Sequence, residues 1–124
     1  MKKLLILAGL LFSLKTSFAQ KIAGLWYSSD SSRVYEIKQT AVNKYVAVIR
    51  SSTRKTDSAG YVVIKELLYN NRKKRYEGII YAVADGAPAF VKIKFSKKDI
   101  NKIRLKLSRA FVFDVLIDWI KVST

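Results

Sequence analysis

Residues 89–107 read AFVKIKFSKKDINKIRLKL, and this stretch decides the predicted fold. Between Ala89 and Phe95, and again between Ile103 and Leu107, every second side chain is apolar. This period of two is typical of strands that bury one face. The largely polar residues 97–101 between the two runs suit a turn. The stretch therefore predicts two antiparallel strands joined as a hairpin, with one apolar face and one basic face.

Patterns on either side of this hairpin predict further strands. Arg33 to Gln39 alternates in the same way, and Lys74 to Ala84 predicts a long strand that runs into Asp85-Gly86, a dipeptide favoured in hairpin turns. Ser51 to Gly60 contains no large apolar residue and predicts an exposed loop. About seven short strands without a long helix close most simply into a barrel. The predicted fold is all-β, a small antiparallel up-and-down β-barrel.

Two segments are compatible with either strand or helix. Residues 61–69 are apolar on both faces and are interrupted by two charged side chains, so both structures stay open there. In residues 111–122, a helix would align Asp114, Asp118 and Lys121 as a polar stripe. The β-branched and aromatic side chains of this second segment fit a pleated surface better, so we predict a strand.

The N-terminus has the three parts of a secretory signal peptide. Lys2 and Lys3 supply positive charge, Leu4 to Phe12 is an apolar run, and Ser17-Phe18-Ala19 places small side chains where signal peptidase reads them. The apolar run is much shorter than the roughly twenty residues that span a bilayer, and Lys15 follows it closely. We therefore predict cleavage after residue 19 and a protein that works in the periplasm or outside the cell.

The predicted mature chain, residues 20–124, is a single β-barrel domain without a transmembrane segment. Three of the 24 Lys and Arg residues lie within residues 1–19, so 21 remain against nine acids, a formal charge of +12. Such a charge draws a protein toward polyanions. Outside the cytoplasm these are lipopolysaccharide, anionic lipid headgroups, acidic polysaccharides and released nucleic acid.

Short motifs are spread along the chain: Gly24-Leu25-Trp26, YEGIIY at residues 76–81 before Asp85-Gly86, VKIKF at residues 91–95, and then Leu105 and Trp119. In this order they resemble the bacterial exported domain-of-unknown-function 2147 family. The resemblance implies a lipocalin-like or calycin-like barrel and transfers no catalytic residue. The chain departs from the family at Ala82-Val83, where an Asp-Pro pair is usual, and at Ser108-Arg109-Ala110, where an Arg-Gly-Tyr-like element is usual.

The composition removes most catalytic chemistry. The chain has no histidine, the usual general base and metal ligand, and no cysteine for thiol or soft-metal chemistry. Asp114 and Asp118 remain as a possible acid and base pair. Among so many lysines, surface ion pairs are the favoured interpretation of these two acids. We predict no catalytic residue, no metal site and no cofactor, and hence a protein that is not an enzyme.

The outward face of the predicted hairpin carries five cations with no acid placed among them on the two strands. They are Lys92, Lys94, Lys102, Arg104 and Lys106. Like charges opposite one another destabilise a sheet by roughly 0.2–1 kcal/mol per pair, so selection for stability alone would place acids there. One hypothesis is that this face binds lipopolysaccharide or anionic lipid headgroups, with Arg104 making bidentate phosphate contacts. The alternative is a merely solvated face.

Aromatic residues at inward or uncertain positions support a second hypothesis. A small apolar or amphipathic ligand would occupy the barrel interior, against rings that combine an apolar body with a polar tip. The candidate contacts are Trp26, Tyr35, Tyr45, Tyr81 and Trp119. The alternative is that these rings fill the core, because a small barrel can be packed by its own side chains.

Arg72 to Arg75, beside Tyr69 and Tyr76, mixes cations with rings that are able to stack on nucleobases. A run of charges is usually a solvated turn, so nucleic-acid binding is the weaker interpretation of this run. Nucleic acid is therefore not a predicted partner.

Overall fold

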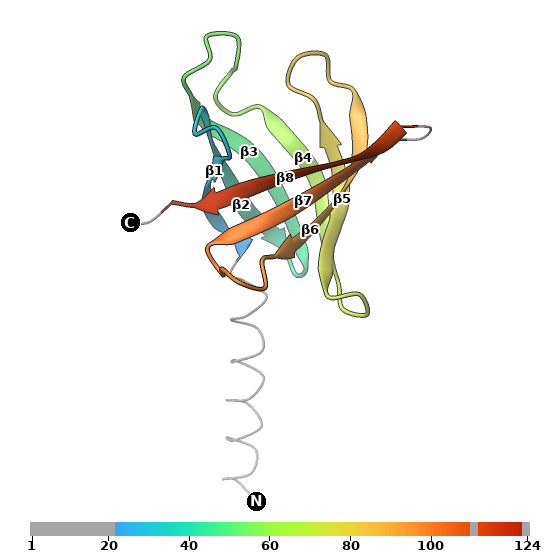
Figure 1. Ribbon diagram of the computed structural model, residues 1–124. Helices are drawn as coiled ribbons and strands as arrows, with labels where there is room; N and C mark the ends of the chain where they lie inside the picture. The colour runs from blue at the N-terminus through green and yellow to red at the C-terminus, as the bar shows by residue number, and fades with distance from the viewer. Residues whose placement is uncertain (1–21, 110–111, 123–124) are drawn as a thin grey trace, which may run out of the picture.

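The structure is a computed structural model that describes residues 22–109 and 112–122. Within these residues eight strands form a closed barrel in which each strand pairs with its neighbours in the chain and β1 pairs with β8 (Figure 1). The strands are β1 (Gly24–Ser28), β2 (Arg33–Ala41), β3 (Lys44–Ser52), β4 (Val62–Asn70), β5 (Arg75–Tyr81), β6 (Pro88–Phe95), β7 (Lys102–Arg109) and β8 (Val112–Lys121). All pairs are antiparallel. The predicted all-β, lipocalin-like up-and-down barrel is confirmed.

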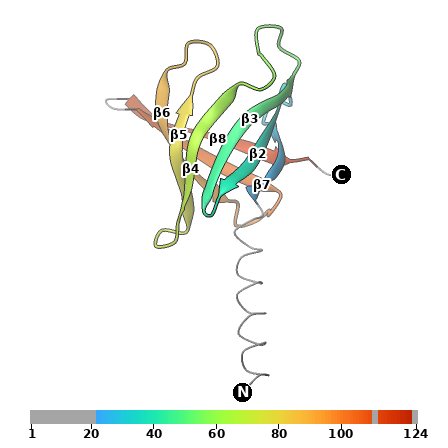
Figure 2. The same ribbon diagram turned by 180° about the vertical axis from the view of Figure 1, so that it is seen from behind.

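The connections divide the barrel into two ends, as both views show (Figures 1 and 2). The loop end carries residues 53–61 and 82–87, which connect β3 to β4 and β5 to β6. The turn end carries the short turns at residues 42–43 and 71–74 and the β6–β7 connection. In the 71–74 turn the Asn70 side chain accepts hydrogen bonds from two backbone N–H groups. Such local bonds close a hairpin without tertiary contacts.

Side chains from alternate positions fill the barrel. Trp26, Trp119, Ile93 and Leu105 are among the fully buried residues, and no described polar or charged residue is buried. The Tyr35 ring stacks on Trp119 with 4.0 Å between ring centroids. The Trp26 indole N–H donates a hydrogen bond of 2.9 Å to the Ile22 carbonyl, which satisfies its polar atom inside the core.

In the hairpin formed by β6 and β7, the inward and outward side chains are the predicted ones. Val91 and Ile93 on β6, and Ile103 and Leu105 on β7, point into the core. Pro88 begins β6, where its missing N–H costs least. The outward face is therefore the basic one, as predicted.

Both ambiguous segments are strands. β8 confirms the predicted strand over residues 112–121, whereas residue 111 lies outside the described residues. Within residues 61–69, β4 contains a β-bulge, seen as a shift of register against β5 between Ile64 and Leu67. Val63 and Ile64 are consecutive and both buried. A bulge places neighbouring side chains on one face, and this accounts for the absence of a clean period of two.

The predicted signal peptide, residues 1–19, lies outside the described residues and stays a prediction. Within the described part of the chain, no helix has the length and apolarity needed to cross a membrane.

Candidate functional site: a basic groove

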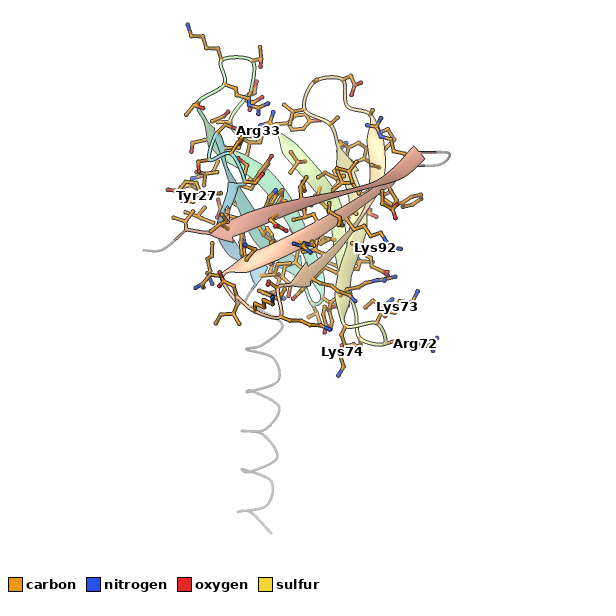
Figure 3. All side chains as sticks on the ribbon, viewed as in Figure 1. Tyr27, Arg33, Arg72, Lys73, Lys74 and Lys92 are labelled. Atoms are coloured by element: carbon orange, nitrogen blue, oxygen red, sulfur yellow. The ribbon has the colours of Figure 1, made fainter. Side chains whose placement is uncertain are left out.

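The five predicted cations lie together on the outside of the barrel. In the register of β6 and β7, Lys92 is opposite Lys106 and Lys94 is opposite Arg104. Lys102 precedes Arg104 by two residues, so it projects from the same face of β7. The Lys92 side chain points away from the barrel (Figure 3). All five line one groove of about 570 Å³, which we call the basic groove.

Three further cations border the basic groove. Arg75 comes from the start of β5, and Lys97 and Lys98 come from the β6–β7 connection at the turn end. Sequence reasoning missed Lys97 and Lys98 because it considered the two strands and not the connection between them, and it assigned Arg75 to the separate basic run of residues 72–75. Among the described residues, eight cations and one acid, Asp118, line the groove.

The two strands carry no acid among the five cations, as predicted, but the neighbouring strand supplies two. The neighbouring strand β8 pairs with β7 so that Asp118 faces Arg104, with 3.0 Å between Oδ1 and Nε. Asp114 lies 3.2 Å from the Lys106 ammonium. The prediction was made for two strands, and the acids come from a third. The outward side chains of a strand contact those of both neighbouring strands, so the two strands of one hairpin do not give the full set of neighbours.

These ion pairs shift the titration of both acids. The hydrogen bond from Arg104 lowers the pKa of Asp118. The Ser108 hydroxyl, and then Lys106, lower the pKa of Asp114. Hydrogen bonds therefore favour the ionised form of both acids, and each acid also forms an ion pair with a cation of β7. Surface ion pairs are the arrangement that the sequence favoured over an acid and base pair.

Five lysines of the basic groove have no ion-pair partner among the described residues: Lys92, Lys94, Lys97, Lys98 and Lys102. The two arginines differ from them. Arg75 lies 2.7 Å from a carboxylate oxygen of Glu77, and Arg104 is held by Asp118. The uncompensated charge of the groove therefore resides on flexible ammonium groups, which act as point charges rather than as fixed forks.

A second hollow lies at the loop end of the barrel, and we call it the barrel mouth. It measures about 490 Å³ and is mostly apolar. Its lining includes Tyr35, Val63, Ile80, Tyr81, Leu107, Val115 and Ile117, with Arg33 and Arg109 among them. Of the five aromatic residues predicted as ligand contacts, only Tyr35 and Tyr81 line it. Trp26, Tyr45 and Trp119 are buried in the core.

The two arginines of the barrel mouth are in different states. Arg33, near the loop end in Figure 3, is held by Asp57 through bonds of 2.6 and 3.1 Å. This pairing, with the Ser52 hydroxyl, lowers the pKa of Asp57 to about 2. Arg109 has no ion-pair partner among the described residues. Sequence reasoning missed both arginines. Arg33 lies two residues before the inward Tyr35, and Arg109 lies two residues after the inward Leu107. The alternation of the strands could therefore have placed both arginines on the inward side.

The basic run at residues 72–75 does not form a stacking platform. Arg72, Lys73 and Lys74 extend from the β4–β5 turn (Figure 3). Tyr76 is buried against Tyr45 and Tyr69, with ring centroids 5.5 and 4.8 Å away. The Tyr76 ring therefore packs in the core and is not available to stack on a nucleobase.

In the described part of the chain, no cluster of three or more acidic, histidine or cysteine side chains is placed to hold a metal ion. Comparison of the chain with protein-family models, with curated proteins and with solved structures returns no match. The resemblance to the domain-of-unknown-function 2147 family therefore stays a prediction.

Proposed function

We propose that this chain is an exported, non-enzymatic protein that binds an anionic component of the cell envelope through the basic groove. The observation that carries the proposal is the set of five lysines gathered around one groove without ion-pair partners among the described residues. Cations on neighbouring strands repel one another, and an anionic partner would relieve that repulsion.

The ion pairs of the basic groove indicate how it would bind. Arg104 already directs Nε and one terminal nitrogen at Asp118, at 3.0 and 3.4 Å, so its charge is compensated and only its other edge is left for a phosphate. The lysines would carry the binding. Ammonium groups on long stems adapt to phosphates at many spacings, so we expect recognition of charge density with strong dependence on salt.

The test removes three lysines without breaking an ion pair. In the triple variant Lys92→Gln, Lys94→Gln, Lys102→Gln, we expect affinity for phosphatidylglycerol vesicles to fall roughly 100-fold at low salt. Each lysine near an anionic surface contributes about 1 kcal/mol. Binding to soluble polyphosphate should fall as well. Both are measured by titration at several salt concentrations, on protein processed by the cell and shown by mass to begin at Gln20.

A matched control carries the same net charge. Lys44, Lys55 and Lys73 lie on β3, in the β3–β4 loop and in the β4–β5 turn, and none of them lines the basic groove or has an ion-pair partner among the described residues. Changing these three to Gln should leave most of the affinity. Equal losses of vesicle affinity in the two triple variants would show that binding follows the total charge of the protein and not the groove. Export is tested separately: a cytoplasmic pool of the protein that retains residues 1–19 would contradict it.

The barrel mouth supports a second candidate function, the binding of a small amphipathic ligand. Its volume lies in the range of small-molecule sites, which also combine apolar walls with few charged groups. The stacked Tyr35 and Trp119 fill the barrel interior, so the ligand would rest at the mouth. Arg109 would meet its carboxylate.

A fluorescent fatty-acid probe tests this second candidate. We expect stoichiometric binding that weakens about tenfold or more in Arg109→Gln, because a hydrogen bond to a charged group contributes about 1.5–3 kcal/mol. Trp26→Phe, a change in the buried core away from the mouth lining, should leave the affinity intact. Equal affinity of the probe for the wild type and for Arg109→Gln would contradict the proposal that the barrel mouth binds a carboxylate ligand through Arg109.

A further inference from the structure

Large apolar side chains are exposed around the basic groove. Phe90 on β6 is 64% exposed, and Leu116 and Ile120 on β8 are 57% and 42% exposed. Leu116 also lines the groove itself. Exposed apolar residues scattered singly need no explanation, whereas several around one charged site indicate an interaction surface.

The strand register places each of these side chains beside a lysine. Phe90 lies two residues before Lys92 on β6, so both project from the same outward face. On β8, Leu116 is opposite Lys106 and Ile120 is opposite Lys102. The outer face of β6, β7 and β8 is therefore an amphipathic surface in which cations and hydrocarbon alternate over short distances. Its two acids, Asp114 and Asp118, are each held in an ion pair with a cation of β7.

The surface has a boundary on its β4–β5 side. Glu77 on β5 is opposite Lys92 and pairs with Arg75. Glu66 on β4 is exposed and lines the same surface hollow as Phe90. Glu66 has no ion-pair partner among the described residues, so its carboxylate at this edge opposes contact with an anionic surface. The face that would meet the partner is thus the one formed by β6, β7 and β8, which cross the front of the barrel in Figure 1.

A soluble polyanion would satisfy the lysines and leave the apolar side chains in water. The interface of a bilayer with anionic lipids offers phosphates to the lysines and, a few ångströms deeper, acyl chains to the apolar side chains. We infer that the partner of the basic groove is such a bilayer surface, into which Phe90, Leu116 and Ile120 insert. This inference rests on the proposed function, because it names the partner of the same groove.

The first experiment separates insertion from charge. The triple variant Phe90→Thr, Leu116→Thr, Ile120→Thr places β-branched residues, which suit strands, at the three positions and keeps all the lysines. We expect about a tenfold or greater loss of affinity for phosphatidylglycerol vesicles and unchanged binding to soluble polyphosphate, since only the first involves apolar transfer. The control is Val42→Thr, which changes a side chain 91% exposed in the β2–β3 turn. It should bind both as wild type does.

The outcomes distinguish this inference from the proposed function. If the threonine variant keeps its vesicle affinity while Lys92→Gln, Lys94→Gln, Lys102→Gln loses affinity, the groove binds anions without insertion and the inference is overturned. If the lysine variant loses affinity for neither vesicles nor polyphosphate, the proposed function fails and the inference fails with it.

A second variant tests insertion even if the threonine variant does not fold. In Phe90→Trp, vesicle binding should shift the fluorescence of the introduced tryptophan to shorter wavelength, and lipids brominated on their acyl chains should quench this fluorescence. The native Trp26 and Trp119 are buried and should respond little. Val42→Trp should show neither effect. No quenching of Phe90→Trp on bound vesicles would overturn insertion.

Discussion

Replacing Trp119 with alanine is expected to lower the free energy of unfolding by about 3–5 kcal/mol, the range for truncating a buried large aromatic side chain. Trp119 is 1% exposed and stacks on Tyr35, so its removal leaves a cavity and an unsupported ring. The total free energy of unfolding of a domain of this size is about 5–15 kcal/mol, so the expected loss is a large fraction of its stability. Urea denaturation followed by circular dichroism measures it.

Leu116→Ala is the matched control on the same strand. Leu116 projects outward and is 57% exposed, so its truncation should cost less than about 1 kcal/mol. The pair also tests the facing of β8. If the Leu116 variant lost as much stability as the Trp119 variant, the inward and outward positions of the strand would be reversed.

The second large effect is expected at Gly78 on β5. A side chain added there would point at the backbone of β4, and its Cβ would overlap the carbonyl oxygen of Glu66. The β4 bulge brings that carbonyl close to β5. Because the obstacle is backbone, no rotamer change relieves it. We expect Gly78→Ala to cost about 3 kcal/mol, the upper end for overpacking, by the same denaturation assay.

Gly86→Ala separates this overlap from ordinary glycine strain. Gly86, in the β5–β6 loop, has φ 72° and open space where a Cβ would lie. Its replacement should cost about 1–2 kcal/mol through backbone conformation alone. A Gly78 variant no less stable than the Gly86 variant would show that the bulge does not press on β5.

The candidate site was predictable to the extent that it is local. Lys92 and Lys94 on one strand and Arg104 on the next share a face because a hairpin pairs segments close in sequence. The alternation alone gives that facing. Asp114 and Asp118 could not be placed among them, because their position depends on the register of β8 against β7. The lining of the groove also depends on the β6–β7 connection, which supplies Lys97 and Lys98.

The all-β class, the hairpin of β6 and β7 and the strand in residues 112–121 follow from the sequence by itself. Each of them depends on side-chain alternation or β-propensity within a few residues, which the chain carries whatever surrounds it. The tertiary structure alone decided the bulge at Ile64 to Leu67, the register in which β8 pairs with β1 and the filled interior beneath the mouth. These features depend on packing between residues distant in the chain, such as Tyr35 on Trp119, and no local pattern encodes which distant side chains will meet.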